Sequence, residues 1–471
     1  MKNKFFVMDK DAIKTTGRSN KLRRLALINP INYGRTSFRP PFGLMVIKAL
    51  FEERGVEVLW IDCDVNRHDQ EYLLKKLNKN NDIQMIVIGG MHTTYLHVKE
   101  IFKQLKDNDI DLPTLVGGRL ALTLDYMLWE KIPNLDMVCK VEGENVVHSI
   151  CNNFPNFDKV KGIQLRVGGD IVDNGPVPIK KHLNDWPRFN YEMLGPKYFE
   201  EHRAFLLSSI GCPYKCSFCR TFEKSADKVR TMTVDKFFEE QILPFLTYDM
   251  AGTGVPIQLF TMVDEFFLLY KERAHEFCDA VEKYGLQGSM MWRCSGRADI
   301  IKRIKKDVDL LKRMVDCGAE GLNMGLESGS QIMLNNMNKS VKVQQYEDTI
   351  ATCREAGMNI FATFIFGLPG ETRETALESV AWRKKMGLGG KYFYATPYPG
   401  TDLYRGFKEK YAPTIDEEES YFLNAPSLKK LSVNLSGMSD QEFLDVDQEC
   451  REELAKITTN LDGWLGVAEK D

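Results

Sequence analysis

The chain has 471 residues, which is too long for one compact hydrophobic core and therefore predicts two or three domains. Hydrophobic residues make up 43% of the composition and charged residues 27%, values that are typical of a globular protein in water. The formal net charge of −3 argues against a general nucleic-acid binder, which would be clearly basic.

The apolar runs and the cysteine content predict a cytoplasmic protein. No apolar run approaches the roughly 20 residues that are needed to span a bilayer, and the first residues lack the apolar core of a signal peptide. The 11 cysteines are odd in number and scattered, which does not fit a disulfide framework. Residues 1–24 are rich in lysine and arginine, and we interpret them as a basic tail.

Strand-like and helix-like patterns alternate between residues 25 and 151. The runs LALINP (25–30), VEVLWIDC (56–63) and IQMIVIGGMHTTY (83–95) have the apolar character of buried strands. FGLMVIKALFEERG (42–55) has apolar residues at helical spacing before a glycine stop. The alternation predicts an α/β domain with a Rossmann-like, doubly wound parallel sheet, whose ligands would bind at the carboxyl ends of the strands.

Three further segments follow this module. Residues 152–201 are polar and interrupted by prolines, which is typical of a linker. In residues 202–401, strand-like runs such as AFLLSSIG and NIFATFIFGLPG alternate with helical patterns. This alternation predicts a partial (β/α)6 barrel with its chemistry at the carboxyl ends of the strands. Residues 402–471 are charged and helical in pattern, and we expect a small helical C-terminal cap.

The stretch SSIGCPYKCSFC contains three closely spaced cysteines, Cys212, Cys216 and Cys219. A structural zinc site would need a fourth ligand, and the nearest candidates, His202 and Cys278, lack a paired spacing. Three unrelated buried cysteines are a second interpretation, although the turn-like sequence makes burial awkward. The third interpretation is an iron–sulfur cluster, whose irons take thiolate ligands and which would keep one iron open for a further ligand.

This stretch and the strands that flank it resemble the signature of the radical S-adenosylmethionine (SAM) superfamily. That signature is C-x-x-x-C-x-Φ-C, and Phe218 takes its aromatic position. The resemblance extends over residues 205–404 and implies a four-iron, four-sulfur cluster whose open iron chelates the methionine part of SAM. It also implies reduction by an external donor of the flavodoxin or ferredoxin type, and cleavage of SAM to a 5′-deoxyadenosyl radical.

Other barrel motifs resemble the family's SAM contacts. FTMVDEFF, WRCSGRAD, GLESGSQ and FIFGLPGET resemble the second-strand, carboxylate-binding, ribose-binding and adenine-binding segments. A guanidinium such as that of Arg297 suits the methionine carboxylate because its donors form a fork. An exposed acidic loop at Asp264 and Glu265, a solvent salt bridge at Arg297 and a tight turn at the glycines are the alternatives. The implied SAM contacts are Phe218, Asp264, Arg297, Glu327, Ser328, Lys339, Ile365 and Gly367.

Two residues are candidates for contact with the substrate. Tyr398 follows the sixth strand in TPYPGTDLY and could face a substrate or pack in the core. Cys294 lies on the third strand and could face the cavity, although most buried free cysteines act as small hydrophobic residues. No second group of cysteines with paired spacing remains, which argues against an auxiliary cluster and sulfur insertion.

The first module resembles the cobalamin-binding domain of a large class within this superfamily. The matching pieces are PPFGLMVIKALFEERGVEVLWID, VIGGMHTTY, LVGG and VEGE, in this order. The implied contacts with the corrin and its tail are Gly89, Gly90, Met91, Thr93, Thr94, Gly117, Gly118 and Glu142. The D-x-H-x-x-G motif that supplies a cobalt ligand elsewhere is absent, since His92 has Gly90 where the motif has Asp. A domain of the same shape without cobalamin is the alternative.

The combined resemblance implies cobalamin-dependent methylation of an unactivated carbon in a small-molecule substrate. One alternative is a radical SAM enzyme that performs a rearrangement, cyclisation, dehydration or epimerisation. Another is an iron–sulfur sensor without catalysis, although a sensor has no need of adenine-binding and ribose-binding loops. The sequence offers no basic groove that would favour RNA, so we expect no nucleic-acid partner.

Overall fold

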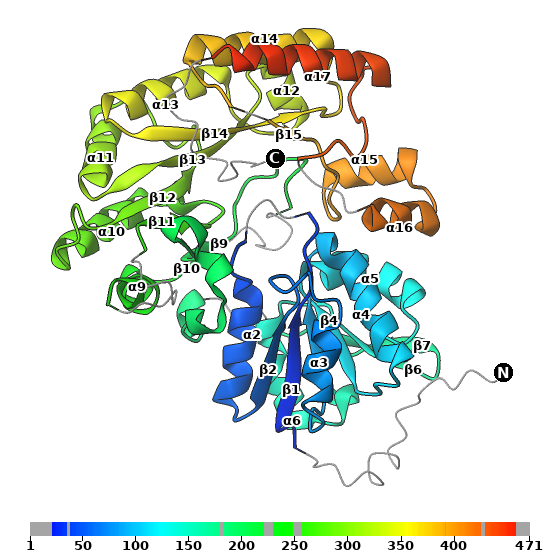
Figure 1. Cartoon of the computed structure of the whole chain (residues 1–471). Helices are drawn as coiled ribbons and strands as arrows, with labels where there is room; N and C mark the ends of the chain where they lie inside the picture. Colours follow the sequence, from blue (N-terminus) through cyan, green and yellow to red (C-terminus); the bar gives the residue numbers. More distant parts are fainter. Residues whose placement is uncertain are drawn as a thin grey trace.

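The computed structural model consists of two α/β modules and a helical C-terminal part (Figure 1). The first module, blue to cyan in Figure 1, lies below the second, and the carboxyl ends of its parallel strands point toward the second module. The predicted basic tail falls almost entirely outside the described residues. The structure describes residues 21–34, 38–178, 182–220, 229–247, 257–390, 392–424 and 429–457, apart from the side chains of 200 and 201.

The first module is built on a seven-stranded sheet in the order β2-β1-β3-β4-β5-β6-β7. The strands β1 to β5 are parallel, and β6 and β7 continue the sheet in antiparallel orientation. The strands are β1 (Arg24–Asn29), β2 (Glu57–Asp62), β3 (Ile86–Gly89), β4 (Thr114–Gly117), β5 (Met137–Cys139), β6 (Ile163–Val167) and β7 (Asp170–Asp173). The helices are α2 (Phe42–Glu53), α3 (Tyr72–Asn78), α4 (Tyr95–Asp107), α5 (Gly118–Lys131) and α6 (Val147–Asn153).

Each face of this sheet has its own hydrophobic core, because successive strand residues point to opposite sides. On β1, Leu25 and Leu27 pack with residues of α2 and α6. Ala26 and Ile28 pack with residues of α3, α4 and α5 on the other face. Helices therefore cover both faces, which confirms the predicted Rossmann-like, doubly wound arrangement.

The segment 152–201, which the sequence suggests is a linker, contributes ordered structure to both modules. β6 and β7 extend the first sheet, and a 3₁₀ turn (Pro196–His202) leads into the barrel. Tyr198 of this turn donates a hydrogen bond to Asp62 (2.9 Å) at the carboxyl end of β2. β7 is exposed along its whole length, so its sequence lacks the buried-strand pattern on which the prediction relies.

The second module is a sheet of six parallel strands, β8-β11-β12-β13-β14-β15, which curls into the predicted partial barrel (Figure 1). A short antiparallel pair, β9 (Ser209–Ile210) and β10 (Arg230–Thr231), follows β8. The barrel strands are β8 (Arg203–Leu206), β11 (Leu259–Met262), β12 (Met291–Gly296), β13 (Ala319–Glu327), β14 (Asn359–Phe366) and β15 (Phe393–Tyr394). The helices are α8 (Val234–Phe237), α9 (Leu243–Thr247), α10 (Lys271–Lys283), α11 (Lys305–Asp316), α12 (Gln331–Asn336), α13 (Val343–Glu355) and α14 (Arg373–Met386).

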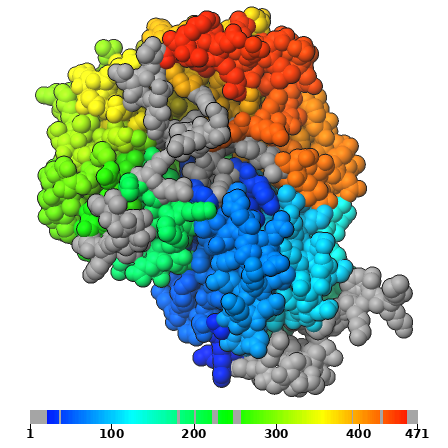
Figure 2. All heavy atoms as spheres, in the orientation of Figure 1, coloured from blue at the N-terminus to red at the C-terminus, as the bar shows by residue number. Residues whose placement is uncertain are grey.

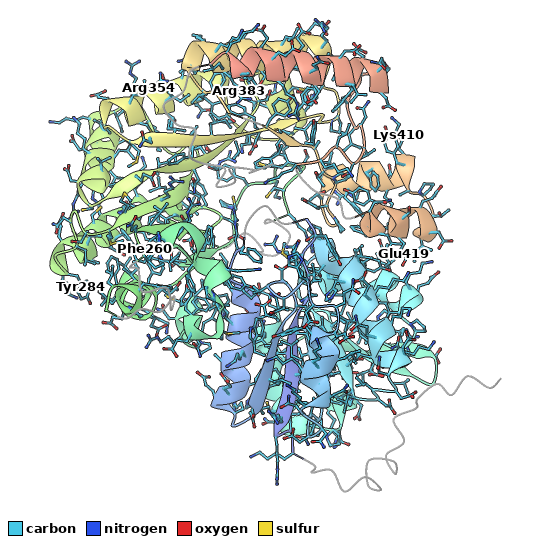
Figure 3. All side chains as sticks on the ribbon, viewed as in Figure 1. Phe260, Tyr284, Arg354, Arg383, Lys410 and Glu419 are labelled. Carbon is cyan, nitrogen blue, oxygen red and sulfur yellow. The ribbon has the colours of Figure 1, made fainter. Side chains whose placement is uncertain are left out.

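The barrel helices pack against the outer face of the curled sheet. Trp292 of β12 contacts Phe277 of α10, with ring centroids 4.6 Å apart. Phe260 of β11, labelled in Figure 3, points to the same face and lies 6.2 Å from the ring of Phe245 of α9. The residues that alternate with these on each strand consequently face the barrel interior.

The C-terminal residues form α15 (Asp402–Tyr411), α16 (Ile415–Leu423) and α17 (Asp440–Ala455), as expected for a mainly helical segment. α17 lies along α14, whereas α16 contacts α4 of the first module. Figure 2 shows this second contact where the orange surface meets the cyan surface. Within the described part of the chain, no helix is both long and apolar enough to cross a membrane.

Two buried acidic residues attach α16 to the first module. Glu418 has no exposed side-chain surface and accepts a hydrogen bond from Tyr126 of α5. Glu419, labelled in Figure 3, accepts hydrogen bonds from Tyr95 and Lys99 of α4, both at 2.6 Å. Because a buried carboxylate needs partners, these contacts fix the cap to the face of the first module.

We expect Glu418→Ala to weaken the attachment of α16. The substitution leaves Tyr126, Tyr404 and Lys408 without their shared acceptor, and the free energy of unfolding should fall by about 3 kcal/mol. Thermal melting and hydrogen exchange of α16 measure the effect. Glu409→Ala removes an exposed carboxylate of α15 and should change stability by less than about 0.5 kcal/mol. Equal effects of the two variants would contradict the attachment.

Candidate functional site

The three cysteines of SSIGCPYKCSFC lie in a loop directly after β9, at the carboxyl end of the first barrel strand. Backbone contacts fasten the loop on two sides. The N–H of Ser217 donates to the carbonyl of Met337 (2.9 Å), and the carbonyl of Ser217 accepts from the N–H of Leu403 in α15 (3.0 Å). Asn338 also donates to the carbonyl of Lys215 (2.8 Å). Segments on both sides of the barrel mouth therefore set the position of the loop.

The three thiols differ in exposure and share one electrostatic environment. Cys216 is buried, Cys212 is half-buried and Cys219 is exposed. Burial raises the pKa of the Cys212 and Cys216 thiols, and the charge on Cys219 adds to this increase. The positive charges of Lys339 and Arg297 lower the pKa of Cys216 in opposition, which favours the metal-binding thiolate. Nη1 of Arg297 lies 3.8 Å from Sγ of Cys216.

The three thiols lie close enough to act on one another electrostatically. An iron–sulfur cluster takes each thiolate on a different iron, so the three sulfur atoms need not surround one ion. The loop therefore fits an iron–sulfur cluster with three protein ligands.

Arg297, Glu327 and Lys339 come together beside this loop. Lys339 donates to Glu327 (3.1 Å), and both side chains are buried. Arg297 donates to the carbonyl of Lys339 (2.7 Å) and to Asp299 (2.9 Å), and its guanidinium lies 3.6 Å from the ring centre of Tyr214. Glu327 ends β13 with a φ of 67°, a conformation that is strained for a residue other than glycine and recurs at functional sites. The group presents two cations and one carboxylate to a ligand at the loop.

Phe218 and Ile365 lie on the same side of the sheet as this group. The ammonium of Lys339 lies 5.8 Å from the ring centre of Phe218. On β14, Phe364 points outward to Arg383 (4.0 Å), which Figure 3 shows beneath α14. Ile365 consequently points to the barrel interior, because neighbouring strand residues alternate.

Ser328 and Gly367 are engaged within the chain. The hydroxyl of Ser328 accepts from the N–H of Ser330 (3.1 Å) and lies 3.5 Å from that of Ser379. Gly367 has a φ of 89°, and its N–H donates to the buried carboxylate of Glu371 (2.5 Å). The Gly367 N–H is therefore not open to an adenine base, and the turn that follows β14 is held by Glu371.

Asp264 makes its hydrogen bonds within the fold. Its carboxylate accepts from the N–H and hydroxyl of Ser208 (2.7 and 2.6 Å) and from the hydroxyl of Ser209 (2.6 Å). The residue is only 3% exposed. With its oxygens occupied, Asp264 positions the chain that leads from β8 into the cysteine loop.

The predicted glycines of the first module allow the turns after β3 and β4 to pack closely against each other. The N–H of Gly90 donates to the carbonyl of Gly117, and the carbonyl of Gly90 accepts from Leu120, both at 3.0 Å. A Cβ on Gly118, whose φ is 79°, would lie 2.5 Å from the oxygen of Gly90. A Cβ on Gly89 would lie 2.2 Å from a leucine of α2. The turns after β3 and β4 therefore pack together at the carboxyl edge of the sheet.

Buried polar atoms that lack a hydrogen-bond partner in the described part of the chain lie at this edge, although the carboxylate of Glu142 also pairs with Arg230 through its other oxygen (2.5 Å). Nδ1 of His92, Oγ1 of Thr93 and Oε2 of Glu142 are buried and have no hydrogen-bond partner among the described residues. The hydroxyl of Thr94 donates to the carbonyl of Met91 (2.8 Å), whose side chain is exposed. Burial, aided by two nearby arginines, lowers the pKa of His92 to about 3, so its imidazole is neutral. These donors and acceptors fit the amide-bearing corrin of cobalamin.

The two strand-end edges are joined by contacts that the sequence analysis does not identify. Glu265 accepts from the N–H of Gly211 (3.1 Å), next to the first cysteine, and pairs with Arg119 of α5 (3.6 Å). Arg220, which follows the last cysteine, donates to Thr123 of α5 (3.2 Å). α5 thus contacts the end of the cysteine loop directly and is linked to its start through Glu265. The sequence offers one signal for these contacts, which is the position of the two arginines: Arg119 directly follows LVGG and Arg220 directly follows CSFC.

The two predicted substrate contacts have different surroundings. Tyr398 packs on His92 of the first module, with ring centroids 4.2 Å apart. Cys294 has no exposed surface and shares the outer face of β12 with Trp292. Burial raises the pKa of its thiol, and the charge of Asp264 and then the thiol of Cys278 in α10 add to this increase. Cys294 therefore faces the helices, which corrects the expectation that it faces the barrel cavity.

Comparison with protein families assigns both modules. The model of the radical SAM superfamily matches residues 206–382, which begin at the end of β8, include the cysteine loop and end within α14. The model of the B12 binding domain matches residues 35–150, which begin before α2 and end within α6. The matches therefore follow the division of the structure into a first sheet and a barrel.

Named methyltransferases are among the relatives. An uncharacterized methyltransferase of Pyrococcus horikoshii is 26% identical over 374 residues, which cover 78% of this chain and 78% of that protein. Bacteriochlorophyllide d C-8(2)-methyltransferase of Chlorobaculum tepidum is 29% identical over 355 residues, or 74% of each chain. Cytidylyl-2-hydroxyethylphosphonate methyltransferase of Streptomyces wedmorensis is 24% identical and covers 90% of this chain and 88% of that protein.

Solved structures share the fold. The radical S-adenosylmethionine methyltransferase TsrM of Kitasatospora setae, with tryptophan and a SAM analog bound, superposes with a TM-score of 0.66 at 17% identity. The match covers 83% of this chain and 76% of TsrM. The cobalamin-dependent SAM radical enzyme OxsB, with aqua-cobalamin and SAM bound, gives a TM-score of 0.63 at 17% identity and covers 89% of this chain and 58% of OxsB.

The buried carboxyl of Glu371 should make stability depend on pH. Burial raises its pKa from 4.5 to about 7, so the folded chain holds this proton more tightly than the unfolded chain. The contribution is fully present below about pH 4.5 and is lost as the pH rises through 7. It amounts to about 3 kcal/mol. Glu371→Gln, which keeps an acceptor for Gly367, should remove this slope from melting curves between pH 5 and 8.

An exposed glutamate on the following helix provides the control. Glu378→Gln lies on α14 and should leave the pH dependence of the parent chain unchanged. A Glu371→Gln chain whose melting temperature falls with rising pH as steeply as that of the parent would contradict the assignment to this carboxyl.

Proposed function

The chain belongs to the radical SAM superfamily and carries a B12-binding domain before the barrel, and we propose that it is a cobalamin-dependent methyltransferase of an unactivated carbon. The observation that carries the proposal is that the carboxyl edge of the first sheet contacts the carboxyl edge of the barrel sheet. Arg220, directly after the cysteine loop, donates to Thr123 of α5 and acts electrostatically on His92 of the first sheet. Glu265 links the start of the loop to Arg119 of α5. Such a seam suits chemistry that uses two cofactors.

The barrel residues would bind the cluster and SAM. The three loop cysteines would hold a four-iron, four-sulfur cluster. Arg297 and Lys339 would bind the methionine carboxylate, for which their charges and donors are suited. Glu327, oriented by Lys339, would accept hydrogen bonds from the ribose hydroxyls. Phe218 and Ile365 would line the same space with apolar surface.

The first module would hold the corrin. His92, Thr93 and Glu142 supply buried polar atoms without partners at the strand ends, and a bound corrin would satisfy them. When bound, the cluster supplies the electron that cleaves SAM, and cobalamin carries the methyl group that is transferred. The residues of the chain position these groups and exclude water from the reacting atoms. A small-molecule substrate and an external one-electron donor complete the proposed reaction.

We expect Cys216→Ala to remove the cluster and SAM cleavage together. After anaerobic reconstitution, the variant should lack the iron–sulfur absorbance and should form no 5′-deoxyadenosine, because a cluster held by two thiolates loses an anchor. Absorbance, iron content and product analysis measure this. Cys151→Ala removes a half-buried thiol of the first module and should retain both properties. A Cys216→Ala chain that still cleaves SAM would overturn the assignment.

We expect the full-length chain to bind cobalamin through the edge of the first sheet. Equilibrium dialysis with hydroxocobalamin should show binding, and Thr93→Val should weaken it about tenfold, the effect of losing one hydrogen bond. Thr114→Val, at the opposite end of the strands, is the matched control. Unchanged affinity in Thr93→Val would contradict the site. A chain that forms 5′-deoxyadenosine without corrinoid or methylated product would favour another radical SAM reaction.

A further inference from the structure

The loop between β12 and α11 concentrates positive charge on the surface of the barrel. Residues 302–306 read KRIKK, and we call them the basic segment. Its four cations, Lys302, Arg303, Lys305 and Lys306, are exposed, and none has an ion-pair partner in the part of the chain that the structure describes. The whole chain has a formal net charge of −3, so this surface has the opposite sign to the chain as a whole.

Two of these cations occupy positions that a helix disfavours. Lys305 and Lys306 are the first two residues of α11, where the partial positive charge of the helix end repels a cation. Asp307 follows them but is buried, where it accepts from the N–H of Lys302 (2.6 Å) and pairs with Lys271 (2.6 Å). Its charge is therefore engaged within the fold. Cations that lower the stability of their own helix favour a role in binding.

An apolar side chain lies in the middle of the four cations. Ile304 is 49% exposed. Ile300 and Leu310, on either side of it in the chain, line a mainly apolar recess of about 230 Å³. An apolar centre with a charged rim is typical of a surface that binds another protein. A nucleic acid, which is bound chiefly through its phosphates, would use the cations but not Ile304.

The basic segment is linked to the cysteine loop through a few contacts. Asp299, three residues before Lys302, accepts a hydrogen bond from the hydroxyl of Tyr214 in the cysteine loop (2.5 Å). Arg297 donates to the same carboxylate (2.9 Å), lies over the ring of Tyr214 and reaches within 3.8 Å of Sγ of Cys216. A partner on the basic segment is therefore placed beside the thiols that would hold the cluster.

The chain that leads to the basic segment is held from a neighbouring helix. The hydroxyl of Thr349 in α13 contacts the carbonyls of Ala298 and Ile301 at 2.7 and 3.0 Å. Figure 1 shows α11 on the side of the barrel that lies away from α15 and α16. The cap therefore does not cover the segment, and the segment has its direction before a partner binds, which limits the entropy that binding costs.

We propose that the basic segment is the docking surface for the external electron donor, a flavodoxin-type protein with an acidic face around its flavin. The four cations attract the acidic face, and Ile304 contacts the apolar dimethylbenzene edge of the flavin. One electron passes from the flavin, which is oxidised, to the cluster, which is reduced, and no bond is made or broken. This assignment rests on the proposed function, because the proposed cluster is what requires the electron.

Binding of a flavodoxin to the reconstituted full-length chain tests the surface directly. Calorimetry should show an affinity that falls as the ionic strength rises. Lys305→Glu with Lys306→Glu should weaken binding at least about tenfold, because attraction becomes repulsion. Acidic residues are favoured in the first turn of a helix, so this variant should melt no lower than the parent. Lys79→Glu with Lys106→Glu makes the same change of charge at exposed positions of the first module and should bind normally.

The choice of reductant separates docking from catalysis. With reduced flavodoxin below saturation, formation of 5′-deoxyadenosine should be about tenfold slower in Lys305→Glu with Lys306→Glu than in the parent. With dithionite, a small reductant that needs no docking surface, the two chains should react equally. Ile304→Ala should weaken flavodoxin binding about fivefold at low and at high ionic strength alike. Equal flavodoxin-driven rates in the charge-reversed variant and in its control would overturn the proposal.

Cys216→Ala distinguishes this proposal from the proposed function. The variant loses a cluster ligand and keeps the basic segment, so its flavodoxin binding should equal that of the parent. A parent chain that binds flavodoxin through Lys305 and Lys306 but never cleaves SAM would overturn the proposed function alone. A parent chain that cleaves SAM with dithionite but does not bind flavodoxin through this segment would overturn the docking surface alone. Tighter binding of a ferredoxin or of single-stranded RNA through the same lysines would also overturn it.

Discussion

Parallel strands bring all their carboxyl ends to one edge of a sheet, and in this chain two such edges face each other. A charged group between the edges has little access to water and needs a partner from the opposite module. Glu265 meets this constraint, since it accepts from Gly211 at the start of the cysteine loop and pairs with Arg119 of α5. The first module therefore helps to place the cysteine loop, and the chemistry proposed for the loop depends on that seam.

The division between satisfied and unsatisfied polar groups separates supporting residues from candidate ligand contacts. Asp264 and Glu371 are buried carboxylates that hold the chain before the cysteine loop and the turn after β14. Their hydrogen bonds are made within the protein. His92 and Thr93 are also buried, yet each has a polar atom without a partner among the described residues. Since such atoms lower stability, their retention at the strand ends favours binding.

The sequence predicts the two parallel sheets because buried strands and intervening helices have distinct periodicities. It misses β7, which is exposed on both faces, it does not foresee the hydrogen bonds of Asp264, and it places Cys294 on the wrong face of its strand. A motif shows that a residue lies at a strand end, but not that serines of another strand occupy its oxygens. Cys294 points to the same face of β12 as Trp292, two residues earlier. The large side chain of Trp292 packs in the core between the sheet and the outer helices. Because Trp292 and Cys294 are two residues apart on one strand, they point to the same face, and this spacing is the signal that would have corrected the prediction for Cys294.

The C-terminal cap and the loop before it also contact the turn after β3, at the carboxyl edge of the first sheet. Tyr398 packs on His92, and Tyr421 of α16 donates to the carbonyl of Pro397, next to Tyr398 (3.0 Å). Tyr95, three residues after His92, donates to Glu419 of the same helix. The turn after β3 is thus held by Tyr398 of the loop after β15 and by α16 of the cap. A ligand that takes the place of Tyr398 on His92 loses part of its binding free energy to breaking this contact, while the hydrogen bonds of α16 to α4 can remain.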